Sequence, residues 1–302
     1  MNISFEHDLF VVGEYFQIHD PAGKRISSAL WETFDALYAG KQTGRFRWVQ
    51  LSKIEKERWW AIAKIYIQRE FGFLDGCSAD FSIAGVEVAC EISRKFGEWP
   101  ITPEARNQIC MLITAIDNEN PTWSLGLVRA TLLRLKVRKN HVTETILNKT
   151  GLTAIHWLWR DAPLPPNTLL QIPNKTTNRI LTMKSVDDRI NELFRSAQGL
   201  IVSRTVVATV AQQDDYMKRV RTNGGARSAL KPEGIIILGQ YESHARIATQ
   251  LDLPRPGQGD FVSTRVFPAT GPGKSVAEIG GSFWRRAGES DPIVAAPDLP
   301  KI

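Results

Sequence analysis

Residues 79–93 read Ala-Asp-Phe-Ser-Ile-Ala-Gly-Val-Glu-Val-Ala-Cys-Glu-Ile-Ser and predict a tight turn followed by a β-strand. Residues 86–92 alternate in character, and successive side chains of a strand point to opposite faces of the sheet. Glu87, Ala89 and Glu91 therefore share one face of the predicted strand. The opposite face is apolar and consists of Val86, Val88, Cys90 and Ile92.

Asp80 precedes this strand at the start of the turn, close enough in sequence to meet its carboxylate-bearing face. Mg²⁺ takes carboxylate oxygens and keeps several waters, one of which can become the attacking hydroxide of a nuclease. Such sites usually combine an acid before the strand with an acid-x-Lys sequence on it, and this strand offers Ala89-Cys90-Glu91. Asp80 and Glu91 are the candidate metal ligands, and Glu87 is a further candidate for catalysis.

Composition sets broad limits on the function. The 302 residues are 43% hydrophobic, which is enough for one large or two ordinary domains. The net charge of +6 and the pI near 9.3 favour a polyanionic partner. The three cysteines lack metal-ligand spacing and suit free thiols in a reducing compartment. No secretion signal or membrane span is recognisable, so we expect a cytoplasmic, nucleoid-associated protein without a membrane partner.

The first part of the chain alternates predicted helices and strands. Apolar residues at helical spacing predict helices over residues 26–39 and 51–71, and apolar runs predict strands at 109–116 and from residue 123 onward. This order is typical of an α/β core, which we assign to residues 1–160.

Prolines in residues 161–168 predict an extended linker to a second domain, residues 169–302. In this domain we expect a helix at 185–198, an apolar helical run at 200–210 and a polar helical segment at 212–221. Strands are expected at 233–239 and 261–268. Helices followed by a small antiparallel hairpin are typical of a winged-helix or helix-turn-helix domain.

Residues 212–231 combine cations with side-chain amides. Arginine pairs with guanine in the major groove, glutamine and asparagine pair with adenine, and glycine lets backbone amides approach phosphates. A solvated helix face is the alternative interpretation of such a charged run. The candidate DNA-binding residues are Gln212, Gln213, Tyr216, Lys218, Arg219, Arg221, Asn223, Arg227 and Lys231.

The chain resembles the NaeI-type restriction endonucleases over nearly its whole length. The resemblance is strongest at residues 189–195, 208–221 and 224–239, and in the first domain it appears at 42–45, 69–71, 83–86 and 109–128. It implies a restriction-endonuclease-like core, with a mixed sheet flanked by helices, and a C-terminal winged-helix domain. It also implies Mg²⁺-dependent cleavage of double-stranded DNA by a homodimer, with a second duplex held by each C-terminal domain as an allosteric effector.

The resemblance also implies a catalytic set, and three of its four positions are substituted. The first family acid falls on Lys64, the second on Asp80, the strand acid on Ala89 and the lysine on Glu91. One interpretation is a DNA-binding protein with lost or strongly reduced cleavage. Another is an active Mg²⁺-dependent enzyme with a rearranged site, in which Lys64 supplies the ammonium. In a third, Lys64 and Glu91 form a salt bridge that only supports the fold.

Overall fold

The computed structural model describes residues 3–138, 145–221 and 224–300. The chain forms two compact units, the first from residues 1–37 and 51–165 and the second from residues 38–50 and 166–302. The chain passes from the first unit to the second for the last time between residues 165 and 166, inside the segment whose prolines predict a linker. Residues 38–50 belong to the second unit, whereas the domain boundaries expected from the sequence placed them in the first domain, residues 1–160.

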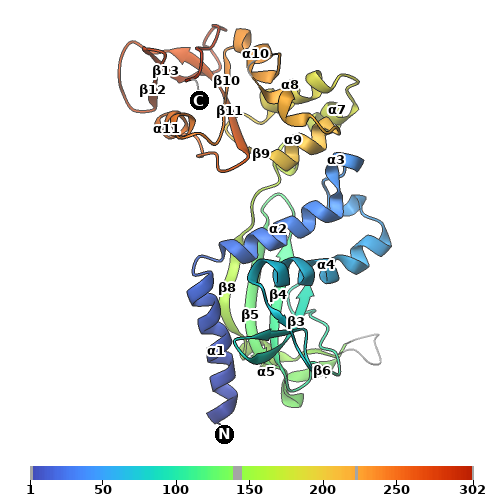
Figure 1. Ribbon diagram of the computed structural model, residues 1–302. Coiled ribbons are helices and arrows are strands. Elements are labelled where there is room, and N and C mark those ends of the chain that lie inside the picture. Colours follow the sequence, from blue (N-terminus) through green and yellow to red (C-terminus); the bar gives the residue numbers. More distant parts are fainter. Residues whose placement is uncertain (1–2, 139–144, 222–223, 301–302) are drawn as a thin grey trace. The chain divides into compact units, whose positions relative to one another are not determined.

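The first unit contains a six-stranded sheet in the order β1-β2-β3-β4-β5-β8 (Figure 1). Its strands are β1 (Leu74–Asp75), β2 (Phe81–Ile83), β3 (Val86–Ser93), β4 (Ile109–Ile116), β5 (Thr122–Arg129) and β8 (His156–Pro163). Strands β3 and β4 run parallel and the other neighbours antiparallel. The sheet is therefore mixed, as the family resemblance implies.

Helices and a separate hairpin surround this sheet. The helices are α1 (Ile3–His19), α2 (Lys24–Tyr38), α4 (Lys53–Phe71), α5 (Lys149–Thr153) and the 3₁₀ turn η2 (Leu132–Arg134), and the hairpin strands are β6 (Leu135–Val137) and β7 (Thr145–Leu147). Helix α2 packs on α4 through the stacked rings of Phe34 and Trp59, whose centroids are 5.9 Å apart. No helix formed by the described residues is long and apolar enough to cross a membrane.

The register of the strands places Ala89 near one end of the sheet. Ala89 on β3 pairs with Cys110 on β4, which pairs with Val128 on β5. The adjacent row, Ile109 with Arg129, is the last row of the β4–β5 ladder at that end. Asp80 directly precedes β2, and the β2–β3 register continued by one residue places it across from Ala89.

The second unit joins short helices to an antiparallel sheet. Its helical segments are α3 (Gly40–Thr43), η1 (Trp48–Gln50), α6 (Thr168–Gln171), α7 (Asn174–Thr182), α8 (Val186–Ser196), α9 (Arg204–Ala211), η3 (Tyr216–Val220), α10 (Ala226–Leu230), η4 (Lys231–Glu233) and α11 (Glu242–Gln250). The strands are β9 (Ile201–Ser203), β10 (Ile235–Leu238), β11 (Asp260–Pro268), β12 (Val276–Ile279) and β13 (Ser282–Arg286). The sheet order is β10-β11-β13-β12, and β9 also pairs with β11.

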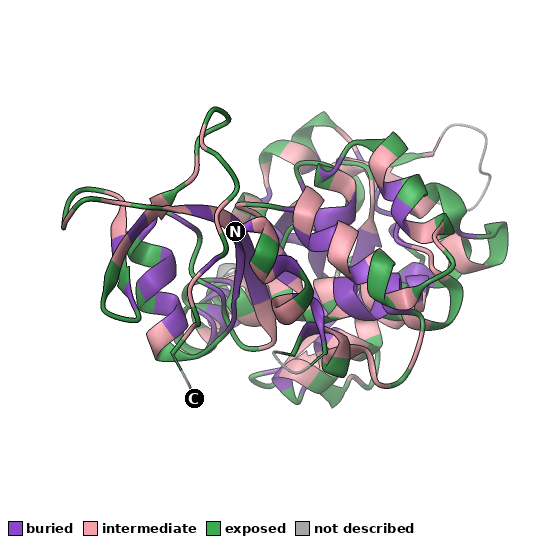
Figure 2. Cartoon of the chain, turned by 90° about the horizontal axis from the view of Figure 1, so that it is seen from above, coloured by how far each residue is buried: buried purple, intermediate pink, exposed green. Residues whose placement is uncertain are grey.

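Two expectations for this unit are wrong in detail. The apolar run at 200–210 divides into β9 and α9, because the Ser203 side chain caps the helix by accepting from the Val206 amide. The polar segment at 212–221 forms only η3, because Gln212 ends α9 in the left-handed conformation with φ of 52°. Figure 2 shows buried residues on one side and exposed residues on the other in several helices, whereas α9 is buried all round over residues 206–211.

Residues 38–50 are built into the core of the second unit. Phe46 belongs to its main hydrophobic cluster, and its carbonyl accepts a 2.9 Å hydrogen bond from the buried Asn167 side chain. Helix α3 packs so closely on α9 that a Cβ at Gly40 would overlap the Thr209 hydroxyl. The second unit therefore requires a segment that lies far away in the sequence.

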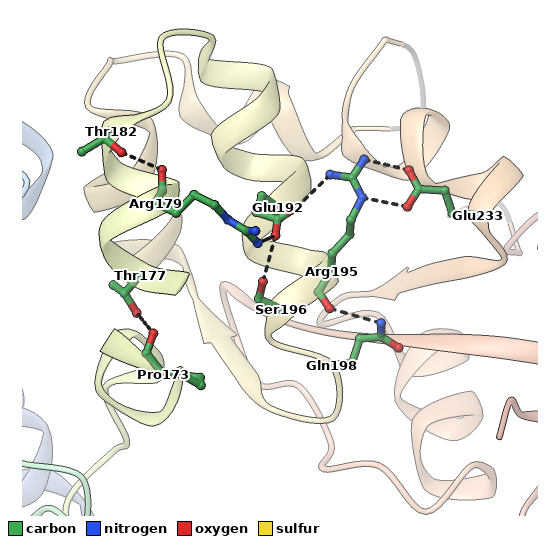
Figure 3. A network of polar contacts seen from close by, with 9 residues as sticks. All are labelled: Pro173, Thr177, Arg179, Thr182, Glu192, Arg195, Ser196, Gln198 and Glu233. Atoms are coloured by element: carbon green, nitrogen blue, oxygen red, sulfur yellow. Dashed lines mark hydrogen bonds and ion pairs between the residues drawn. The ribbon is translucent and has the colours of Figure 1, made fainter. Parts of the chain in front are cut away.

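An ionic network joins α7, α8 and η4 (Figure 3). Arg195 on α8 makes two 2.7 Å hydrogen bonds to the carboxylate of Glu233 and lies 3.2 Å from Glu192. Glu192 also pairs with Arg179 on α7. The Arg195 guanidinium lowers the pKa of Glu233. These pairs link α7, α8 and η4, and the segments η3 and α10 of residues 212–231, which we call the basic segment, pack on α8.

Candidate functional site

Helix α4 delivers Lys64 to the sheet. Its first turn has a capping box, in which Ser52 and Glu55 each accept a hydrogen bond from the other's backbone amide. Such caps stabilise a helix by about 1 kcal/mol. Trp59, Ala63 and Ile67 form the buried stripe of the helix, and Lys64 lies at the edge of this stripe.

Lys64 and Asp80 form a partly buried ion pair. The Lys64 Nζ donates to Asp80 Oδ1 at 2.7 Å, with the two side chains 18% and 31% exposed. The other Asp80 oxygen accepts a 2.7 Å hydrogen bond from the Cys90 amide. Burial lowers the pKa of Lys64, but the Cys90 thiol and the carboxylates of Asp80 and Glu91 outweigh it and raise the pKa above its ordinary value. Both oxygens of Asp80 are thus engaged by the protein itself.

Glu91 lies on the same face of β3 as Ala89 but is only 6% exposed. Burial raises its pKa to about 8, although the Lys64 ammonium acts in the opposite direction. Burial therefore favours the protonated form of the Glu91 carboxyl, and a cation bound there would have to displace that proton.

A cavity of about 790 Å³ contains these groups. Lys64, Asp80, Ala89 and Glu91 all line it, so the structure brings together the four positions to which the resemblance assigns the catalytic set. The remaining lining residues are Trp60, Ser78, Ala79, Ile92, Pro100, Thr102, Pro103, Glu104 and Ala105.

Glu87, a candidate catalytic residue in the sequence, binds backbone amides in the structure. Its carboxylate accepts hydrogen bonds from the backbone amides of Cys77, Ser78 and Ala79 at 2.8–3.1 Å. These bonds lower the pKa of Glu87, with those from Ser78 and Cys77 contributing most. Glu87 thus holds the turn before β2 and is not among the residues that line the cavity.

The residues at this position do not fit a divalent cation. Ala89 supplies no ligand, Asp80 is paired with Lys64 and the Cys90 amide, and burial disfavours the ionised form of Glu91. Across residues 3–138, 145–221 and 224–300, no group of three His, Cys, Asp or Glu side chains could hold a metal ion. The third interpretation, a salt bridge between Lys64 and Glu91, does not match the described contacts, in which Lys64 pairs with Asp80.

Sequence reasoning missed the far wall of the cavity, residues 100–105. Thr102 and Glu104 reach the cavity from the loop between β3 and β4, and Trp60 reaches it from α4. Pro100 and Pro103, on either side of Thr102, indicated that the backbone of this loop is restricted. The spacing along one strand could not show which loop returns to cover that strand.

In the second unit, several expected DNA-binding cations are used inside the fold. Arg219 lies 3.2 Å from Asp187 and 3.7 Å from Asp215, and Lys231 lies 2.6 Å from Asp298. Arg227 donates to the Ile237 carbonyl at 2.9 Å, and burial lowers its pKa. These contacts favour structural roles for the three side chains.

The other candidates remain more accessible. Lys218 and Arg221 are exposed, and neither side chain pairs with another described residue. Gln212 is exposed beside Gly44, Gln213 is half-buried, and the Tyr216 hydroxyl accepts a 3.2 Å hydrogen bond from Arg204. Asn223 lies outside the described residues. The structure therefore leaves a smaller cationic surface than the sequence suggests, centred on η3.

Comparison with known proteins adds a family relationship. The family model for restriction endonuclease NaeI matches residues 11–295. The chain is 42% identical over 290 residues to the type II restriction enzyme NaeI of Lentzea aerocolonigenes, covering 93% of this chain and 91% of that enzyme. The match extends through both units.

Proposed function

Because the chain belongs to the NaeI restriction endonuclease family, we propose that it is a sequence-specific double-stranded DNA-binding protein with lost or strongly reduced cleavage. Family membership implies the DNA partner. The ion pair between Lys64 and Asp80 carries the second part of the proposal, because it occupies the acid that remains.

Hydrolysis by the family's chemistry needs acids that converge on a cation and a lysine beside the attacking water. Here the acid on β3 is replaced by a buried alanine, and the position of the lysine holds a glutamic acid whose ionised form is disfavoured by burial. Removing members of a catalytic unit typically costs several orders of magnitude in rate. A cavity of this composition does not supply the convergent acids and the free lysine that this chemistry needs.

A rearranged, Mg²⁺-dependent active site is the second candidate. It is favoured by one observation, that Lys64, Asp80 and Glu91 line a single cavity. In this alternative the bound cation would have to displace Lys64 from Asp80, and Lys64→Ala and Glu91→Ala would each abolish cleavage while leaving DNA binding intact.

The second unit is proposed to be the winged-helix DNA-binding domain. Its order of α8, β9, α9, α10, β10 and β11, with β9 and β10 both pairing with β11, supports this assignment. Helix α11 then occupies the connection between β10 and β11. By analogy with the family, we further propose a homodimer in which each protomer binds two duplexes.

The proposal is tested with a duplex selected by the purified protein from a randomised pool. Gel shifts without added metal, on the methylated and on the unmethylated duplex, should show binding to at least one of the two. This binding should persist in excess non-specific DNA. With Mg²⁺ or Mn²⁺, the same duplex should remain uncut at full occupancy. Cleavage that Asp80→Ala abolishes would refute the loss of activity, and absence of selective binding would refute the DNA-binding role.

A further inference from the structure

Two adjacent leucines stand out on the surface of the first unit. Leu132 and Leu133 in η2 are 67% and 87% exposed, and Val137 on β6 is also exposed. A single exposed leucine is ordinary, but an apolar group on a shared turn is typical of an interaction surface. We call residues 131–135 the leucine turn.

The leucine turn is held rigidly. The Asn148 side chain donates to the carbonyls of Leu133 at 2.8 Å and Leu135 at 3.2 Å, and the Asn148 amide donates to Arg134 at 2.8 Å. A Cβ at Gly151 would overlap the Arg134 carbonyl, so α5 lies directly against the turn. The backbone therefore presents the leucines outward at little further cost in conformational entropy.

The leucine turn is attached to the wall of the cavity. The Ile101 amide and carbonyl hydrogen bond to Thr145 on β7 at 2.7 and 2.8 Å. On the other side, the Asn107 amide donates to the Ala130 carbonyl at 3.0 Å. The cavity-lining residues 102–105 lie between these two attachments. A duplex placed against the cavity would thus lie at the end of the sheet that carries the turn.

The surroundings of the leucine turn are basic. Residues 130–138 and 145–153 contain the cations Arg134, Lys136, Arg138 and Lys149 and no Asp or Glu, although Glu144 lies between the two ranges in the sequence and Arg138 pairs with Glu98 at 3.5 Å. Lys136 and Lys149 are exposed. In duplex DNA, stacked apolar bases lie between two anionic phosphate backbones. A pair of leucines bordered by cations complements this arrangement better than it complements a protein surface.

We propose that the leucine turn is a DNA wedge, in which Leu132 and Leu133 insert at a base step beside the cavity while Lys136 and Lys149 contact the flanking phosphates. Proteins that kink DNA use leucine in this way, and they offset the cost of unstacking through the extra contacts that a bent duplex allows. The inference rests on the proposed DNA-binding function and adds a contact and a deformation to it.

The test uses the full chain and its selected duplex, with 2-aminopurine placed at successive positions. Binding should raise the fluorescence at one step, because an unstacked 2-aminopurine is no longer quenched. The Leu132→Ala/Leu133→Ala variant should lose this increase and bind about tenfold more weakly, as expected when the burial of leucine side chains is lost. Ile18→Ala on α1, where Ile18 is also 67% exposed, is the matched control and should behave as wild type.

Three results would overturn the wedge. The first is a wild-type complex in which no base step is unstacked, and the second is an unstacked step that the double variant retains. The third is a double variant that changes the oligomeric state in sedimentation but not DNA affinity, which would assign the turn to self-association. If the wild type binds no duplex at all, the proposed function itself fails, and this result is distinguishable from the other three.

Discussion

The cavity of the first unit and the basic segment of the second unit use charge in opposite ways. In the cavity, Lys64 and Asp80 neutralise each other and burial favours the protonated form of Glu91. In the second unit, acidic partners engage Arg219 and Lys231, but Lys218 and Arg221 remain exposed. Phosphate binding needs only accessible cations, whereas phosphodiester hydrolysis needs convergent acids. Under the proposed function, this difference allows the chain to bind DNA without cleaving it, because the two activities depend on different groups.

The largest effect is expected from restoring the family pattern in the cavity. Lys64→Glu, Ala89→Asp and Glu91→Lys together would free Asp80, add the strand acid and place an ammonium beside it. We expect Mg²⁺-dependent cleavage to rise by roughly 10³-fold or more over wild type, measured as linear product from plasmid. The same triple variant with Asp80→Ala is the control and should be inactive. Activity that is equal in the two would show that the cavity is not the site of cleavage.

The buried Glu91 makes the stability of the first unit dependent on pH. Its pKa of about 8 in the folded protein exceeds the ordinary value of 4.5, so the folded state holds the proton more tightly than the unfolded state. This stabilisation is complete below the ordinary pKa, decreases as pH rises and is lost above about pH 8.

Urea denaturation can measure this effect. Between pH 5 and pH 8.5, wild type should lose about 3 kcal/mol more unfolding free energy than Glu91→Gln. Glu87→Gln should behave differently, because the lowered pKa of Glu87 makes its contribution present above its ordinary pKa and lost in acid. Identical pH profiles of wild type and Glu91→Gln would contradict the protonated state of Glu91.

In the second unit, Arg227→Ala should reduce stability because the side chain packs inside the fold. The loss of its hydrogen bond to Ile237 and of its contact with the Phe261 ring should cost about 2 kcal/mol of unfolding free energy. Lys218→Ala is the surface control and should change stability by less than about 0.5 kcal/mol. If the Arg227→Ala protein kept full stability but bound DNA weakly, Arg227 would be assigned to the DNA interface instead.

The smallest effects are expected from the exposed cations. Lys218→Ala and Arg221→Ala should each weaken binding modestly and lower the slope of log affinity against log salt by about 0.9, as for one phosphate contact. Arg219→Ala should change the slope less, because Asp187 and Asp215 already pair with this arginine. Equal slopes for all variants would place the DNA interface elsewhere on the second unit.

The sequence predicted the local elements of the fold better than their assembly. Alternation identified β3, and helical spacing identified α4, because each pattern records which face of one element is buried. The insertion of residues 38–50 into the second unit could not be predicted, because it depends on close packing between α3 and α9. For the same reason, strand alternation and the family resemblance named Lys64, Asp80 and Glu91, which line one cavity, but could not show that Lys64 pairs with Asp80 or that Glu87 binds the backbone amides of residues 77–79 instead.

The central claim is tested most directly by metal-dependent conversion of supercoiled plasmid to linear DNA, with wild type and Asp80→Ala compared at full occupancy of the selected site. The account predicts that neither protein yields linear product with Mg²⁺ or Mn²⁺, although both bind. Linear product from wild type that disappears in Asp80→Ala would contradict it.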